Sequence, residues 1–191
     1  MMLYKAIIAT FFLFNVSIDI AEEEIIVWNK NVKLKWTDYK AFLERDTPVA
    51  AASAVGIRYE SITQSNERII LNVNAVFVKK KSGVWMEKAT DDGLLHEQGH
   101  FDLAEIYARK MRNELQNFQF KYEYGKFKSD IIKVYNAYSD SLSLMHRMYD
   151  KDTHYSCLPV KQKEWNQYIK NELKQLEKYS KHFVTVYFKT D

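Results

Sequence analysis

Residues 96–100 read His-Glu-Gln-Gly-His, which places two histidines and a glutamate at the fixed positions of an H-E-x-x-H motif. On an α-helix, residues four apart lie on the same face, so His96 and His100 could offer ring nitrogens to one metal ion. Glu97 would lie about 100° round the helix from His96, where it could reach a metal-bound water without being a ligand. Zinc lowers the pKa of such a water towards about 7, and the glutamate takes its proton as the water attacks a carbonyl. The motif therefore predicts a zinc site with Glu97 as the catalytic base.

The alternative interpretation is an amphipathic surface helix that carries two solvated histidines. A helical projection opposes it, because both histidines continue an apolar stripe of Leu103, Tyr107 and Met111, while Asp102 and Glu105 point away. Gly99 costs about 1 kcal/mol relative to alanine in the middle of a helix. We expect close approach of another backbone or of substrate to explain this glycine.

A catalytic zinc site needs three protein ligands and an open position for water. Glu105 lies about 180° round the helix from His96 and cannot supply the third ligand. We expect that ligand from residues 149–155, which we predict to be a loop. His154 is preferred to Tyr155, because imidazole binds zinc better than a protonated phenol. Tyr155 or a carboxylate of this segment remains an open alternative for the third ligand.

The tyrosines of residues 149–155 and the remaining histidines are not expected to bind the metal as preferred ligands. Tyr149 or Tyr155 is expected to flank the open coordination position, and Tyr149 is the preferred additional catalytic residue. His146 and His182 are interpreted as structural or surface histidines.

Length and composition favour one folded, globular domain that does not bind nucleic acid. The chain has 191 residues and is 47% hydrophobic, enough to build a core. Its formal net charge of +3 is too mild for a nucleic-acid-binding protein. Cys157 is the single cysteine, so no intrachain disulfide can form.

The N-terminal residues have the layout of an export signal. Lys5 precedes an apolar run over residues 6–16, which is followed by acidic residues and is too short for a comfortable membrane span. We interpret residues 1–21 as a signal peptide, with an uncleaved anchor or a buried first strand as alternatives. Residues 22–191 would then form one exported domain, periplasmic or extracellular, without stable membrane insertion after signal removal.

Hydropathy patterns divide the chain into a strand-rich and a helix-rich half. The strand ranges are 24–28, 31–36, 50–59 and 67–79, with a last one at 183–188; the helix ranges are 92–118, 125–148 and 161–179. This order predicts an α+β domain, in which N-terminal antiparallel strands precede a long-helix, zincin-like half that carries the motif.

Several segments together resemble a family of bacterial proteins of unknown function that are predicted to be secreted zinc-dependent proteases. The similar segments are residues 34–39, 51–52, 56–57, Trp85, 94–105, 149–153, Gln162 and Trp165. The resemblance implies an exported metallopeptidase-like domain. The family pattern Tyr-Asp-x-x-Thr-x-His is altered here, because Tyr155 occupies the histidine position and His154 comes one residue early. A loop shifted by one residue or a weakened site would account for this difference.

The residues therefore predict a secreted, zinc-dependent, metallopeptidase-like hydrolase acting on a protein or peptide. Two alternatives are a non-catalytic exported module with the same fold and a zinc hydrolase of non-peptide amides or esters. The sequence does not indicate the substrate's identity or the oligomeric state.

Overall fold

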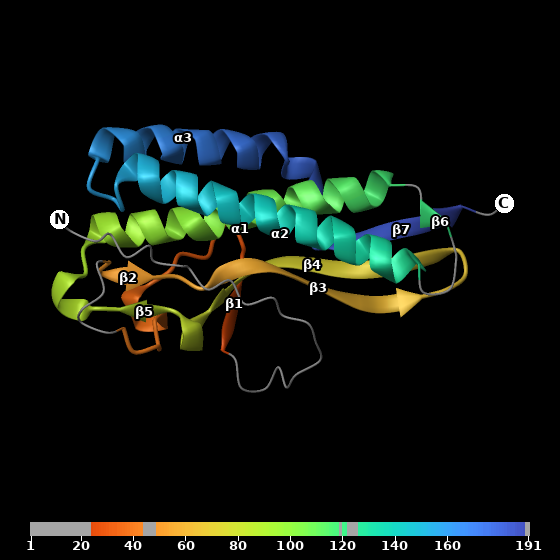
Figure 1. Ribbon diagram of the computed structural model, residues 1–191, viewed down its shortest axis with the longest axis horizontal. Helices are drawn as coiled ribbons and strands as arrows, with labels where there is room; N and C mark the ends of the chain where they lie inside the picture. The colour runs from red at the N-terminus through yellow and green to blue at the C-terminus, as the bar shows by residue number, and fades with distance from the viewer. Residues whose placement is uncertain (1–23, 44–48, 119, 122–125, 190–191) are drawn as a thin grey trace, which may run out of the picture.

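The computed structural model describes residues 24–43, 49–118, 120–121 and 126–189. Its chain forms strands on one side and three long helices on the other (Figure 1). The predicted α+β class is confirmed, as are the antiparallel N-terminal strands. The predicted signal peptide lies outside the described residues and stays a prediction.

The central strand of the sheet is β4 (Arg68–Val78). Its alternating pattern buries one set of side chains against the helices, namely Ile69, Leu71, Val73, Ala75 and Phe77. Strand β3 (Val55–Gln64) pairs antiparallel with β4 along nearly its whole length. Strands β1 (Ile25–Val27) and β7 (Phe183–Lys189) pair antiparallel with opposite ends of β4.

The remaining strands are two residues long. Strand β6 (Phe120–Lys121) runs parallel to β7, and β2 (Ala51–Ala52) pairs with β5 (Gly83–Val84) in a separate small sheet. The strand predicted at 31–36 does not form. Its Leu34 amide donates instead to Oε1 of Gln98 (2.9 Å), and the segment ends in the short 3₁₀ helix η2 (Trp36–Asp38).

Three helices lie on one side of the sheet: α1 (Asp91–Asn117), α2 (Lys126–Thr153) and α3 (Pro159–Gln175). The prediction of three helices holds, with one important difference in their bounds. Helix α2 continues through Thr153, so most of the segment predicted as a loop is helical. Short 3₁₀ turns at Lys79–Lys81, Met86–Lys88 and Glu177–Tyr179 complete the described elements. None of the helices in the described ranges is long and apolar enough to cross a membrane.

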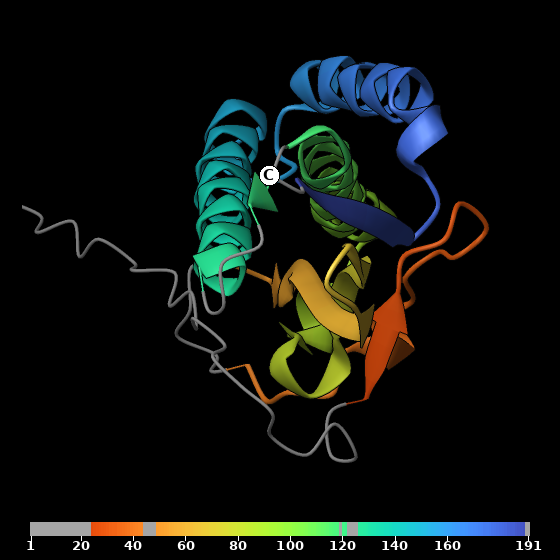
Figure 2. The same ribbon diagram turned by 90° about the vertical axis from the view of Figure 1, so that its right-hand side faces the viewer.

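Helix α1 is the central element of the molecule. Seen along the helices in Figure 2, it lies between the sheet and α3, with α2 beside it. The Thr90 hydroxyl caps its first turn by accepting from the Gly93 amide (3.0 Å). Because α1 is covered on several sides, Glu105 is buried although the helical projection placed it away from the apolar stripe.

Candidate metal centre

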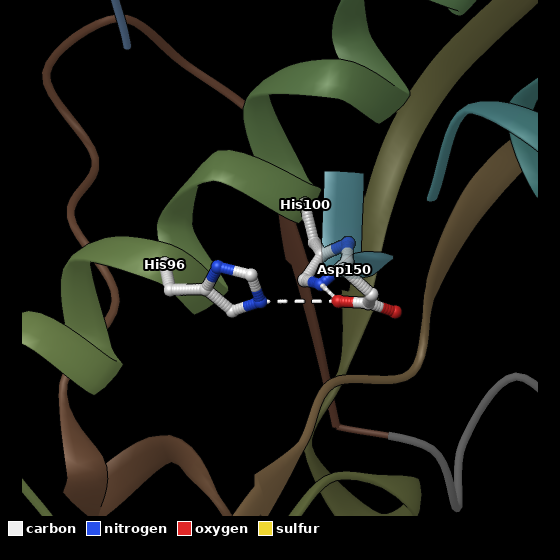
Figure 3. A group of neighbouring side chains, drawn as sticks. All are labelled: His96, His100 and Asp150. Carbon is white, nitrogen blue, oxygen red and sulfur yellow. Dashed lines mark hydrogen bonds and ion pairs between the residues drawn. The ribbon is translucent and has the colours of Figure 1, made fainter. Parts of the chain in front are cut away.

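Helices α1 and α2 bring three potential metal ligands together (Figure 3). Oδ1 of Asp150, from the last turns of α2, lies 3.1 Å from Nε2 of His96 and 2.9 Å from Nε2 of His100. The three ligand atoms all lie within 4.8 Å of one another. Two imidazoles and one carboxylate are an ordinary ligand set for a divalent transition metal. This group could therefore hold a metal ion.

The hydrogen bonds of His96 engage its Nδ1 and leave its Nε2 facing Asp150. Gln162 donates from Nε2 to the Tyr149 hydroxyl (2.6 Å), which leaves its Oε1 to accept from Nδ1 of His96 (3.1 Å). A neutral His96 with its proton on Nδ1 points an Nε2 lone pair at a carboxylate oxygen. Two lone pairs at that distance repel unless a proton or a cation lies between them. A proton between Nε2 of His96 and Oδ1 of Asp150, or a cation in its place, therefore satisfies both atoms.

His100 has an outer partner as well. Its Nδ1 lies 2.9 Å from Nδ1 of His146, a buried residue one turn before Asp150 on α2. Burial lowers the pKa of His146 well below its usual range, and the neighbouring His100 adds to this effect. His146 is therefore neutral beside the cluster. Its burial excludes the surface position that the sequence allowed, and it lies against the cluster.

Asp150 and His100 of the cluster stabilise each other's charged forms. Burial alone would raise the pKa of Asp150, but hydrogen bonds from His100 and His96 outweigh it and lower that pKa strongly. Burial would lower the pKa of His100, yet its hydrogen bond with Asp150 and the nearby negative charges raise it. Asp150 is thus an ionised carboxylate, the form that binds a metal.

Solvent reaches the cluster from the Asp150 side. The side chain of Asp150 is 27% exposed, whereas that of His96 is 5% exposed. The ligand atoms therefore lie at the edge of the core. Solvent can therefore contact the Asp150 carboxylate.

Tyr149 has a different place from the one expected. It is fully buried, its ring stacks on His96 with centroids 4.4 Å apart, and its hydroxyl donates to the His96 carbonyl oxygen (3.1 Å). Burial also raises the pKa of this hydroxyl. The structure therefore places Tyr149 as a support for His96, with its hydroxyl engaged by protein groups.

Tyr149 also explains Gly99. A Cβ atom added at Gly99 would fall within 2.8 Å of Tyr149 Cζ and closer still to its hydroxyl oxygen. The expected close approach is thus made by a tyrosine side chain of α2, and neither another backbone nor substrate is needed to explain the glycine.

Glu97 is buried beside the cluster without joining it. Its Oε2 atom has no hydrogen-bond partner among the described residues. A buried carboxylate oxygen without a partner is costly, so such atoms commonly serve a function. Tyr39, whose hydroxyl shares a hydrogen bond with Ser53 (2.8 Å), lies near enough that Glu97 adds to the burial-driven rise of its pKa.

The structure does not bring His154 into the cluster. His154 is exposed and follows the end of α2, at the first of three consecutive residues with positive φ. The converging group contains Asp150 in its place. The physical reason is that α2 continues to Thr153, which turns Asp150 towards α1 and carries His154 past the site. Tyr155 is likewise exposed, at 54%.

The sequence therefore indicated His96 and His100 as a pair and left a carboxylate of residues 149–155 as an alternative third ligand, but it did not single out Asp150, and it missed His146 and Gln162 as neighbours of the pair. One signal was available. His146, Tyr149, Asp150 and Thr153 follow the i, i+3, i+4, i+7 spacing of one helix face. Extending the predicted helix by five residues would have placed all four towards α1.

Residues 79–156 match the model of a bacterial family described as a bacterial protein of unknown function, DUF922. This agrees with the unknown-function bacterial family that the sequence resembles. No curated protein and no solved structure matches the chain.

Proposed function

We propose that this protein is an exported, zinc-dependent hydrolase that cleaves peptide bonds. The observation that carries the proposal is the convergence of His96, His100 and Asp150 Oδ1, at 3.1 and 2.9 Å, beside a glutamate with an unpartnered carboxylate oxygen. The exported location rests on the apolar run at residues 6–16.

The ligand set favours zinc among the common divalent ions. Imidazole nitrogens suit zinc, whereas magnesium and calcium prefer oxygen ligands throughout. A zinc ion held by His96, His100 and Asp150 would supply Lewis-acid activation of a water or a carbonyl.

The remaining roles belong to the chain's own residues. Glu97 follows His96 on α1, and its unpartnered Oε2 would accept the proton of the attacking water. Gln162 holds the Nδ1 proton of His96, which keeps the Nε2 lone pair available. Tyr149 fixes the ring plane of His96 by stacking. These residues orient the ligands and handle the proton.

A substitution at Glu97 tests the proposal. Glu97→Gln keeps the side-chain size but cannot accept the proton, so we expect zinc binding to persist and peptide hydrolysis to fall by about 10²–10⁴-fold. The assay uses zinc-loaded full-length protein and a peptide library. Glu114→Gln, an exposed glutamate on the same helix, is the matched control and should retain full activity.

Each result has a distinct meaning. Cleavage of small amides or esters but of no peptide would replace the peptidase by a non-peptide hydrolase. Zinc binding without hydrolysis of any substrate would indicate a non-catalytic module. Equal activity of the Glu97 and Glu114 variants would remove Glu97 from the mechanism.

A further inference from the structure

We propose that His146 is a positioning residue of the metal centre. By accepting a hydrogen bond from Nδ1 of His100 when a cation binds, it would stabilise the tautomer of His100 that leaves Nε2 free for that cation. This inference rests on the proposed metal-dependent function and adds a residue that the H-E-x-x-H motif does not contain.

The imidazole rings of His100 and His146 lie within hydrogen-bond distance of each other. Nδ1 of His100 and Nδ1 of His146 lie 2.9 Å apart, and the ring centroids are 4.8 Å apart with a tilt of 60°. Two unprotonated nitrogens would repel at this distance, so one of them holds a proton that the other accepts. A cation on Nε2 of His100 requires the proton on Nδ1 of His100. His146 Nδ1 is then the acceptor.

The other nitrogen of His146 allows this arrangement. Nε2 of His146 is buried and has no hydrogen-bond partner among the described residues. No described group therefore commits His146 to one tautomer in advance. Without a metal, His146 can donate from Nδ1 to His100 while His100 donates from Nε2 to Asp150. With zinc on Nε2 of His100, the proton of His100 lies on Nδ1 and that of His146 lies on Nε2. The pair can follow metal binding without breaking its hydrogen bond.

The placement of His146 on α2 links this role to the ligand itself. His146 and Asp150 are four residues apart on α2, just as His96 and His100 are on α1. Each helix thus offers an i, i+4 pair to the other. Because one face of α2 presents both the ligand and the partner of His100, a correctly docked α2 supplies both together.

The test measures zinc affinity, by competition with a chromogenic chelator, for the full chain and its His146 variants. His146→Leu removes the acceptor, and loss of such an outer partner typically costs 10–100-fold in metal affinity. His146→Asn keeps an acceptor oxygen near the position of Nδ1 and should regain most of the lost affinity. His182→Leu, at a histidine outside the cluster, is the control and should bind zinc like the wild type.

Recovery in the asparagine variant separates hydrogen bonding from packing. Equal weakening of the leucine and asparagine variants, with unchanged circular dichroism, would overturn the proposal in favour of a packing role. Wild-type affinity in the leucine variant would overturn it too. Should that variant fail to fold, His146→Phe keeps a ring without an acceptor and takes its place.

Failure of the proposed function has a different signature. Zinc binding that follows the expected His146 pattern, without hydrolysis of any substrate, would refute the catalytic function and leave the role of His146 intact. A wild-type chain that binds no zinc would refute both.

Discussion

At the scale of single residues, Gly99 and Tyr149 determine how His96 is held. The absent side chain of Gly99 leaves the space that the Tyr149 hydroxyl occupies, and the tyrosine ring stacks on His96. The motif alone fixes only the spacing of the histidines. Their ring orientation depends on these contacts between α1 and α2.

Gly99→Ala tests this contact. Alanine favours a helix over glycine by about 1 kcal/mol. Here its Cβ would fall within 2.8 Å of Tyr149 Cζ, and forced overpacking typically costs about 1–3 kcal/mol. We therefore expect a lower free energy of unfolding and weaker zinc binding, measured by urea denaturation and chelator competition. Gly56→Ala is the control, since a Cβ there meets no atom within 4 Å. A Gly99→Ala variant more stable than the wild type would contradict the account.

At the scale of elements, a buried ion-pair cluster connects α1 to the C-terminal part of the chain. Glu105 accepts from Nε of Arg109 and from Nη2 of Arg112, each at 2.8 Å. Arg109 also donates to the carbonyl of Leu173, and Arg112 to that of Tyr179, both at 2.7 Å. The cluster therefore holds the end of α3 and the turn after it against α1.

Glu105→Gln should weaken this connection strongly. The amide removes the negative charge, which takes the counter-ion from buried Arg112 and leaves Arg109 with only the exposed Glu177 (3.1 Å), a change that typically costs about 3–5 kcal/mol. Urea denaturation should show this loss, while Glu114→Gln on the exposed side of α1 should change stability little. A loss below about 1 kcal/mol would mean that the cluster is not a significant source of stability.

The helices and strands also show which parts of the fold could be predicted from the sequence. The alternating residues of β4 and the stripe on α1 predicted their structures, because each element buries a regular set of side chains. The end of α2 was missed because residues 150–153 (Asp-Lys-Asp-Thr) are all polar and continue no apolar stripe. Asp150 was thereby assigned to a loop, and His154 was preferred on the chemistry of imidazole alone.

The strand predicted at 31–36 failed for another reason. Its Leu34 amide is satisfied by the Gln98 side chain, which donates in turn to Asp102 (2.8 Å). A partner 64 residues away cannot be inferred from local periodicity. A contact between distant segments thus decided this error.

At the scale of the whole molecule, the candidate centre lies between α1 and α2, which also pack against each other through the hydrophobic core. The segment that matches the bacterial family, residues 79–156, contains His96, Glu97, His100 and Asp150. Gln162, which holds His96 from α3, lies outside it. The proposed ligands thus lie within the matched segment, and part of their support comes from beyond it.

The metal content of purified protein tests the central claim most directly, measured by inductively coupled plasma mass spectrometry for the wild type, Asp150→Ala and His154→Ala. We expect about one zinc per chain in the wild type and in His154→Ala. Asp150→Ala should lose most of the metal, because two imidazoles alone bind it far more weakly. A wild type without metal, or zinc that is lost with His154 and retained without Asp150, would contradict the account.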